Sequence, residues 1–180
     1  MTNSEIKVWD ILVRIFHWGL VSSFALAWIT AENWEDMHIW AGFAAAALIG
    51  FRLFWGLVGP KYARFTQFVR GPKATKKYAR AIVRGQEPRY IGHNPLGGLM
   101  VLALLAGLSL TAWTGWLITL PAYKKSGWVE GFHEIMAGFM LTMVVIHIVG
   151  VVYASLRHKE NLARAMVTGK KQSAGPDDVA

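Results

Sequence analysis

The 180-residue chain contains no cysteine, and few of its residues are charged. The lack of cysteine excludes disulfide bonds, thiolate-bound iron–sulfur clusters, cysteine-ligated zinc and covalently attached c-type haem. Only 17% of the residues are charged, whereas 54% are hydrophobic. This balance is extreme for a soluble domain and ordinary for a small bundle of membrane helices. Nine tryptophans suit a protein that is anchored at two membrane–water interfaces.

Four long apolar segments predict four membrane-spanning helices. The third segment holds no ionisable residue, and Gly59-Pro60 ends the second. We therefore expect an all-α membrane protein, a four-helix transmembrane bundle built as a single domain over 1–172, with a disordered polar tail at 173–180. The predicted spans are about 11–30, 38–58, 96–120 and 131–156.

A strongly basic loop, 61–89, separates the second span from the third. It holds nine lysines and arginines and one acidic residue, Glu87. Between 72 and 85, the spacing of Tyr78, Ala81 and Ile82 predicts a basic amphipathic helix on the membrane surface. A nucleic-acid partner would require these charges on a soluble face with stacking aromatics, so we expect none.

The distribution of positive charge predicts the topology. Four spans place both termini and the middle loop on one side of the lipid bilayer. That side carries seventeen of the nineteen lysines and arginines, and the other carries Lys124 and Lys125. The positive-inside rule then predicts a multi-pass protein whose termini and basic loop, with its amphipathic helix, are cytoplasmic.

Four histidines fall at two predicted depths of the membrane. His17 and His147 lie in the cytoplasmic halves of the first and fourth spans, and His38 and His133 open the second and fourth spans on the outer side. The fourteen positions between His133 and His147 put both rings on nearly one helix face, roughly 21 Å apart along the axis. That separation fits two stacked sites and is too long for two ligands of one metal ion.

Histidine pairs from different helices at two depths favour two b-type haems, because a porphyrin must be sandwiched between helices. Each haem would take two imidazole ligands. Zinc is the weaker alternative, since each depth offers only two histidines and few acidic ligands. Hydrogen-bonded packing or a proton relay is the alternative for any one histidine. A transporter subunit with a histidine relay is therefore the non-redox hypothesis.

Three further basic side chains are candidates for the cytoplasmic haem. Arg14 lies one turn below His17, and Arg52 follows His38 by fourteen positions on the same face. We expect both arginines to neutralise haem carboxylates, and snorkelling to lipid phosphates is the alternative. His93, just before the third span, is either a surface group or a contact to a haem propionate.

Sequence motifs along nearly the whole chain indicate one family. They are VWDILVRIFHW at 8–18, GFRLFWGLVGP and YARFTQFVRGP at 50–72, GHNPLGG at 92–98, FHE at 132–134, IHIVGV at 146–151 and SLRHKENLARAMVTGKK at 155–171. On these motifs the chain resembles the four-helix bacterial di-haem cytochromes b. This family groups cytochrome b561 with the b-type cytochrome subunits of nickel–iron hydrogenases.

The resemblance implies bis-histidine ligation of two haem b groups, which falls here on His17, His38, His133 and His147, with no ligand from the third helix. It implies a protein of the bacterial inner (plasma) membrane that passes electrons between ubiquinone or menaquinone and a periplasmic redox partner such as a cytochrome c. The outer links, with Trp34 and Trp128, are one candidate quinone surface, and the cytoplasmic basic side chains are the other.

Two alternative activities stay open on the same resemblance. One is a superoxide:quinone oxidoreductase (superoxide oxidase), and the other is the b-type cytochrome subunit of a hydrogenase, although such members usually carry a further helix. If the chain is itself an enzyme, we expect an oxidoreductase that acts with quinone, either quinol–cytochrome c or superoxide–quinone.

Overall fold

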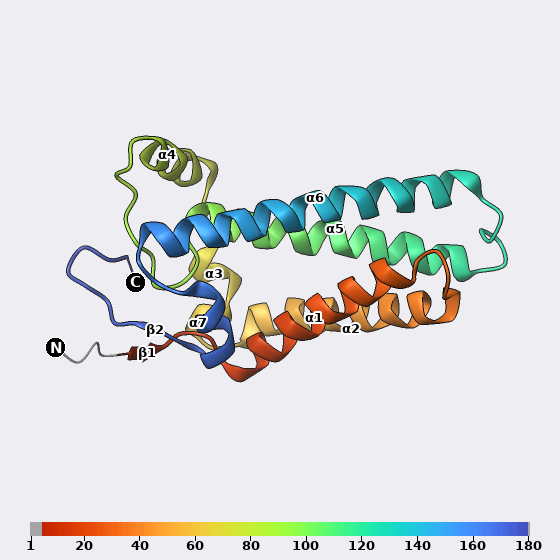
Figure 1. Cartoon of the computed structure of the whole chain (residues 1–180), viewed down its shortest axis with the longest axis horizontal. Coiled ribbons are helices and arrows are strands. Elements are labelled where there is room, and N and C mark those ends of the chain that lie inside the picture. Colours follow the sequence, from red (N-terminus) through yellow and green to blue (C-terminus); the bar gives the residue numbers. More distant parts are fainter. Residues whose placement is uncertain (1–4, 180) are drawn as a thin grey trace. The chain divides into compact units, whose positions relative to one another are not determined.

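Four helices dominate the computed structural model, which describes residues 5–179. Each is long and apolar enough to cross a membrane: α1 (Ile11–Thr30), α2 (Glu35–Val58), α5 (Pro95–Thr119) and α6 (Gly127–Arg157) (Figure 1). The expectation of an all-α membrane protein is confirmed. The helices α2 and α6 begin three and four residues before the predicted spans. Acidic residues in their first turns, Glu35, Asp36 and Glu130, favour this extension through the positive end of the helix dipole.

Shorter elements lie between and after the long helices. They are β1 (Glu5–Lys7), the 3-10 helix η1 (Lys61–Ala63), α3 (Phe65–Phe68), α4 (Pro72–Val83), α7 (Leu162–Thr168) and β2 (Lys170–Gln172). The predicted amphipathic loop helix is α4, which Pro72 starts at a position where a helix needs no backbone N–H. Its Tyr78 is buried, whereas Lys73, Lys77 and Arg80 are exposed.

The chain forms two compact units. The loop unit comprises Met1–Arg14, Trp55–Leu102 and Ile146–Ala180, and the span unit comprises Ile15–Phe54 and Ala103–Val145. Residues 1–4 of the N-terminal lead and Ala180 of the tail lie outside the described residues.

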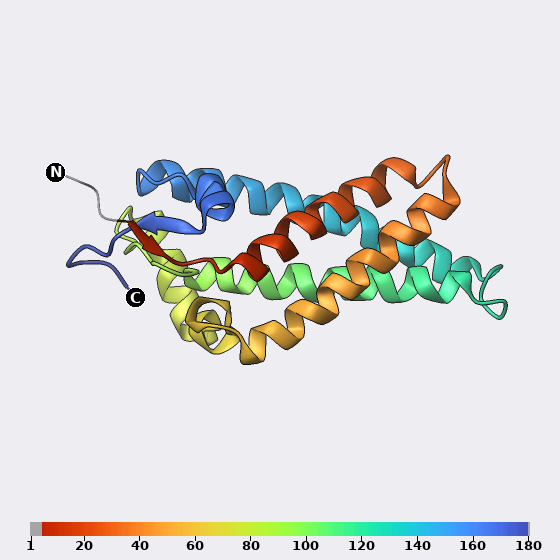
Figure 2. The same cartoon turned by 90° about the horizontal axis from the view of Figure 1, so that it is seen from below.

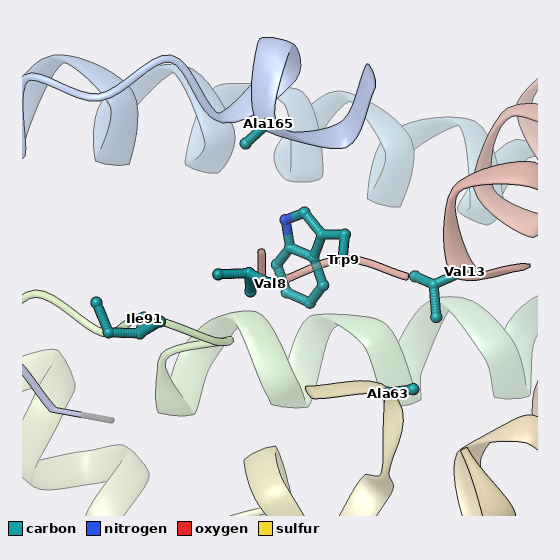
Figure 3. Packing of buried hydrophobic residues seen from close by; sticks show 6 residues of the cluster. All are labelled: Val8, Trp9, Val13, Ala63, Ile91 and Ala165. Carbon is teal, nitrogen blue, oxygen red and sulfur yellow. The ribbon is translucent and has the colours of Figure 1, made fainter. Parts of the chain in front are cut away.

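Three distant stretches of sequence share the core of the loop unit. Strand β1 pairs antiparallel with β2, with Ile6 opposite Lys171 (Figure 2). The backbone N–H groups of Val8 and Trp9 donate to the carbonyl of Gly169. The buried apolar cluster is formed by Val8, Trp9, Val13, Ala63, Ile91 and Ala165 (Figure 3). The N-terminal lead, the basic loop and the C-terminal segment thus pack together, as four spans require, and their cytoplasmic location stays a prediction.

The C-terminal tail differs from the sequence expectation. The sequence predicts disorder at 173–180, but the structure attaches residues up to Val179 to the loop unit. The backbone N–H of Val179 donates to the Arg89 carbonyl at 2.9 Å, and the Ile91 N–H donates to the Val179 carbonyl at 2.9 Å. Asp178 forms an ion pair with Arg89. Because these partners lie about ninety positions away in the sequence, the composition of the tail alone could not reveal them.

Close approaches at glycines pack the helices of the span unit in pairs. A Cβ atom added at Gly19 of α1 would lie 3.2 Å from Leu48 of α2. A Cβ at Gly107 of α5 would collide with the sulfur of Met140 in α6, whose side chain is fully buried. Small residues let membrane helices approach closely in this way, so α1 contacts α2 and α5 contacts α6 within this unit.

Candidate functional site

The structure brings together one of the predicted histidine pairs, His38 and His133, within the span unit. His38 lies in the first turn of α2 and His133 in the second turn of α6. Their ring centroids are 6.0 Å apart and their planes are inclined at 82°. Two imidazoles on opposite sides of one metal ion, with metal–nitrogen distances of about 2.0–2.1 Å as for zinc, would place their centroids roughly 6 Å apart. The pair therefore has the separation that two axial ligands need.

A backbone carbonyl orients the ring of His38. Its Nδ1 atom lies 2.8 Å from the carbonyl oxygen of Ala27 in α1. Because a carbonyl oxygen can only accept, Nδ1 carries the proton and donates it. The lone pair then remains on Nε2, the tautomer that ligates a metal through Nε2.

The helix α5 holds His133 in the same manner. The Nδ1 atom of His133 donates to the carbonyl oxygen of Thr111 at 3.0 Å. The hydroxyl oxygen of Thr114 lies 3.2 Å from the same Nδ1 atom. Thr114 is 1% exposed. A Cβ added at Gly115 would lie 3.0 Å from Cε1 of His133. Thr111, Thr114 and Gly115 thus form a seat for the ring, which we call the α5 seat.

Sequence reasoning missed the α5 seat because it looked for ligands, and α5 has none. The available signal was a run of small and hydroxyl-bearing residues, Thr111, Thr114 and Gly115, in an otherwise apolar helix. Such residues are also common wherever membrane helices pack closely. The position of His133 on α6 is what distinguishes a seat from ordinary packing.

The residues around the pair fit a haem b. A Cβ added at Gly42, one turn after His38 in α2, would meet no atom within 4 Å. Among residues 5–179, no three His, Cys, Asp or Glu side chains lie together so as to hold a metal ion unaided. Two imidazoles with free Nε2 atoms match a haem, whose porphyrin supplies the other four nitrogen ligands.

The second predicted pair, His17 and His147, stays a prediction. His17 belongs to the span unit, where its ring packs edge-on against that of Trp18, with the two centroids 5.1 Å apart. His147 belongs to the loop unit and is half-buried in α6.

The two predicted arginines have different surroundings. Arg52 is 3% exposed in the span unit, and its guanidinium carbon lies 5.9 Å from the centroid of the Phe16 ring. A buried guanidinium in an apolar span is costly unless anions or hydrogen bonds stabilise it. Arg14 belongs to the loop unit and donates to the carbonyl of Val167 near the end of α7, a contact that the sequence did not predict.

His93 packs inside the loop unit. Its ring centroid lies 4.8 Å from that of Trp9 and 4.7 Å from that of Phe68. The side chain is half-buried between these aromatic rings, which differs from the surface position considered for it. Its contact to a haem propionate stays a prediction.

A buried ionic network in the loop unit was not predicted. Glu160 accepts from Arg89 at 2.8 Å and from Lys171 at 3.0 Å. Burial alone would raise the pKa of the Glu160 carboxyl, but the hydrogen bond from Arg89 and the charge of Lys171 outweigh it, so the pKa lies below its ordinary value. Glu87 accepts from Tyr153 and Arg157, each at 2.9 Å.

Comparisons with known proteins show the family of the chain. The family model described as prokaryotic cytochrome b561 matches residues 8–169. Probable Ni/Fe-hydrogenase B-type cytochrome subunits from Azotobacter vinelandii and Azotobacter chroococcum mcd 1 are each 24% identical over 218 residues, covering 93% of this chain and 88% of the relative. The corresponding protein of Rhizobium leguminosarum bv. viciae is 22% identical, covering 94% and 90%.

No solved structure gives a significant match. The family model spans all four long helices and every predicted site residue. This confirms the resemblance drawn from the sequence motifs, and a b-type cytochrome family implies haem b. The chain therefore belongs to the prokaryotic cytochrome b561 family and is an integral-membrane b-type cytochrome of electron transfer.

Proposed function

We propose that this cytochrome carries electrons across the membrane between the quinone pool and a periplasmic redox partner such as a cytochrome c. The observation that supports it most is the His38–His133 pair, whose ring centroids lie 6.0 Å apart. When bound there, haem b supplies a one-electron iron couple. Imidazole ligands from both His38 and His133 would leave a bound haem no open position for dioxygen, which suits transfer of electrons.

Backbone carbonyls hold both proposed ligands of this haem in place. The carbonyls of Ala27 and Thr111 hold the Nδ1 protons of His38 and His133, and both rings therefore present Nε2. His17 and His147 supply the second pair in this proposal, and His147 follows His133 by fourteen positions in the sequence. Arg52, with Arg14 and His93 as further candidates, balances the carboxylates of that second haem.

The α1–α2 link and the α5–α6 link form the proposed contact surface for quinone and the redox partner. Trp34, between α1 and α2, is 57% exposed, and Trp128, at the start of α6, is 69% exposed. Lys124 and Lys125 are also exposed in the α5–α6 link. Flat aromatic groups suit a quinone ring, and the lysines suit an acidic partner.

Two other redox partners deserve a direct test. The relatives bear the name hydrogenase B-type cytochrome subunit, which favours a hydrogenase as the second candidate partner. The two exposed lysines would also attract superoxide, the substrate of the superoxide:quinone alternative.

Inner-membrane location with cytoplasmic termini is part of the same proposal and rests on the positive charge of the loop unit.

Transient absorption of the purified haem-loaded protein tests the proposed function. We expect a short-chain ubiquinol or menaquinol to reduce the b-type haems, and oxidised cytochrome c to reoxidise them. Haem reduction by superoxide faster than spontaneous dismutation would instead favour the superoxide reaction. If neither ubiquinol nor menaquinol reduces the haems, the proposal is refuted.

A further inference from the structure

A basic hollow lies where α2 ends, within the loop unit. It is an open depression of about 360 Å³, lined by Lys61, Arg64, Thr66 and Gln67. Lys61 belongs to η1, Arg64 lies between η1 and α3, and Thr66 and Gln67 belong to α3, which follows α2 in Figure 1. Since α2 is a candidate membrane span, its C-terminal end lies at a membrane–water interface. A site at this level can meet a lipid headgroup.

Two glycines of α2 and the following turn shape the hollow. A side chain at Gly56 would collide with the ring of Phe65, so only glycine lets α3 fold back against the helix end. The Nε atom of Arg64 donates to the carbonyl oxygen of Gly59 at 2.7 Å. This bond holds the guanidinium at the negative end of the α2 dipole and leaves its two terminal nitrogens for an anion.

The sequence on either side of the hollow carries no acidic residue. Residues 37–86 contain nine lysines and arginines and no aspartate or glutamate. Within the described part of the chain, neither Lys61 nor Arg64 forms an ion pair. The Lys61 ammonium lies 5.3 Å from the centroid of the Tyr62 ring. Two unneutralised cations, a hydroxyl and an amide are a donor set that suits a phosphate group.

Exposed apolar side chains lie close in the sequence to the residues that line the hollow. Leu57 and Val58, in the last turn of α2, are 72% and 56% exposed. Val69, directly after α3, is 42% exposed. A free phosphate ion would explain the cations but gains nothing from this apolar surface. A phospholipid meets both features, because its headgroup is anionic and its acyl chains bury apolar side chains.

We propose that this hollow binds the headgroup of an anionic glycerophospholipid, with its acyl chains along Leu57 and Val58. Lys61 and Arg64 contact the phosphate, and the Thr66 hydroxyl donates to it. The lipid would fix the end of α2 against α3 at the membrane surface. This site is independent of the histidine pair and of the proposed redox partners.

Native mass spectrometry of the haem-loaded protein, after exchange into phosphatidylglycerol or phosphatidylcholine, tests the proposal. We expect one phosphatidylglycerol to remain bound at detergent and collision conditions that remove phosphatidylcholine. The double variant K61Q/R64Q should weaken phosphatidylglycerol binding by about tenfold or more, since each cation near a lipid surface contributes about 1 kcal/mol. The matched control K73Q/K77Q removes two exposed charges from α4 and should change binding less than about threefold.

Three results would overturn the proposal. Equal retention of the two lipids would show that the hollow has no preference for an anionic headgroup. Equal losses in the two double variants would assign the attraction to the diffuse charge of the loop. Displacement of the lipid signal by millimolar inorganic phosphate would identify a soluble-anion site. The lipid comparison and the phosphate competition use the unaltered protein, so they decide the matter even if K61Q/R64Q fails to fold.

Discussion

His133 donates its Nδ1 proton to the carbonyl of Thr111, 3.0 Å away on a helix that supplies no histidine of its own. The helix α5 thereby sets which nitrogen of His133 faces the candidate cofactor site. The hydroxyl of Thr114, 3.2 Å from the same nitrogen, strengthens this hold. A hydrogen bond at Nδ1 raises the basicity of the ligating Nε2. The α5 seat is therefore expected to tune the redox potential of one haem.

Replacement of Thr114 by valine keeps the shape of the buried side chain and removes its hydroxyl. Only the difference in hydrogen-bond strength between the ferric and ferrous forms changes the potential, so losing a bond of about 0.5–1.5 kcal/mol shifts it by at most roughly 20–60 mV for a one-electron couple. A less basic imidazole stabilises ferric iron less, so the midpoint potential of one haem should rise. Potentiometric titration measures this shift. Thr114→Ser retains the hydroxyl and is the control, and an equal rise in both variants would contradict the hydrogen-bond argument.

The pairing of histidines predicts which variants lose the same haem. If His38 and His133 are the two axial ligands of one haem, His38→Ala and His133→Ala should each remove that haem, and the double variant should lose no more. His147→Ala should remove the other haem. Pyridine haemochrome assays, expressed per mole of protein, count the haems in each case. Additive loss in the His38/His133 double variant would show that the two residues serve different haems.

Much of the fold could be predicted from the sequence because the bilayer imposes it. A helix that crosses about 30 Å of hydrocarbon needs roughly 20 apolar residues, and α1 and α5 begin and end within a residue of the predicted spans. The ring centroids of His38 and His133, which open the second and fourth spans, lie 6.0 Å apart, and their role as haem ligands stays a prediction. The position of a residue along a membrane-spanning segment determines its depth in the membrane, so depth can be read from the sequence.

Contacts that depend on three-dimensional proximity could not be predicted in this way. Arg89 meets Glu160 and Asp178, which lie 71 and 89 positions away. Nothing in the local composition of 173–179 distinguishes an attached tail from a disordered one. The α5 seat was missed for a related reason, because its main acceptor is the backbone carbonyl of Thr111, and every residue has one.

The buried carboxylate of Glu160 makes the stability of the loop unit dependent on pH. Its pKa in the folded protein lies below the ordinary value of 4.5, chiefly because Arg89 and Lys171 outweigh the effect of burial. Glu160 therefore contributes stability that is fully present above about pH 4.5 and is lost as the pH falls through the lower folded pKa. Burial would raise the pKa of Glu87, but hydrogen bonds from its own backbone N–H, Tyr153 and Arg157 lower it. Glu87 therefore acts in the same direction as Glu160.

Replacement of Glu160 by glutamine should lower the stability of the loop unit at neutral pH and flatten its acid dependence. Breaking a buried ion pair from one side costs about 3–5 kcal/mol, and Lys171, which is 5% exposed, would lose its carboxylate partner. Thermal unfolding in detergent between pH 3 and 7 measures both effects, with proteolysis of the basic loop as the readout of unfolding. Glu5→Gln is the control, because the Glu5–Lys170 pair is more than half exposed on both sides and should contribute little. A melting temperature of Glu160→Gln that falls with pH as steeply as that of the unaltered protein would assign the acid sensitivity to other carboxylates, with Glu87 the first to test.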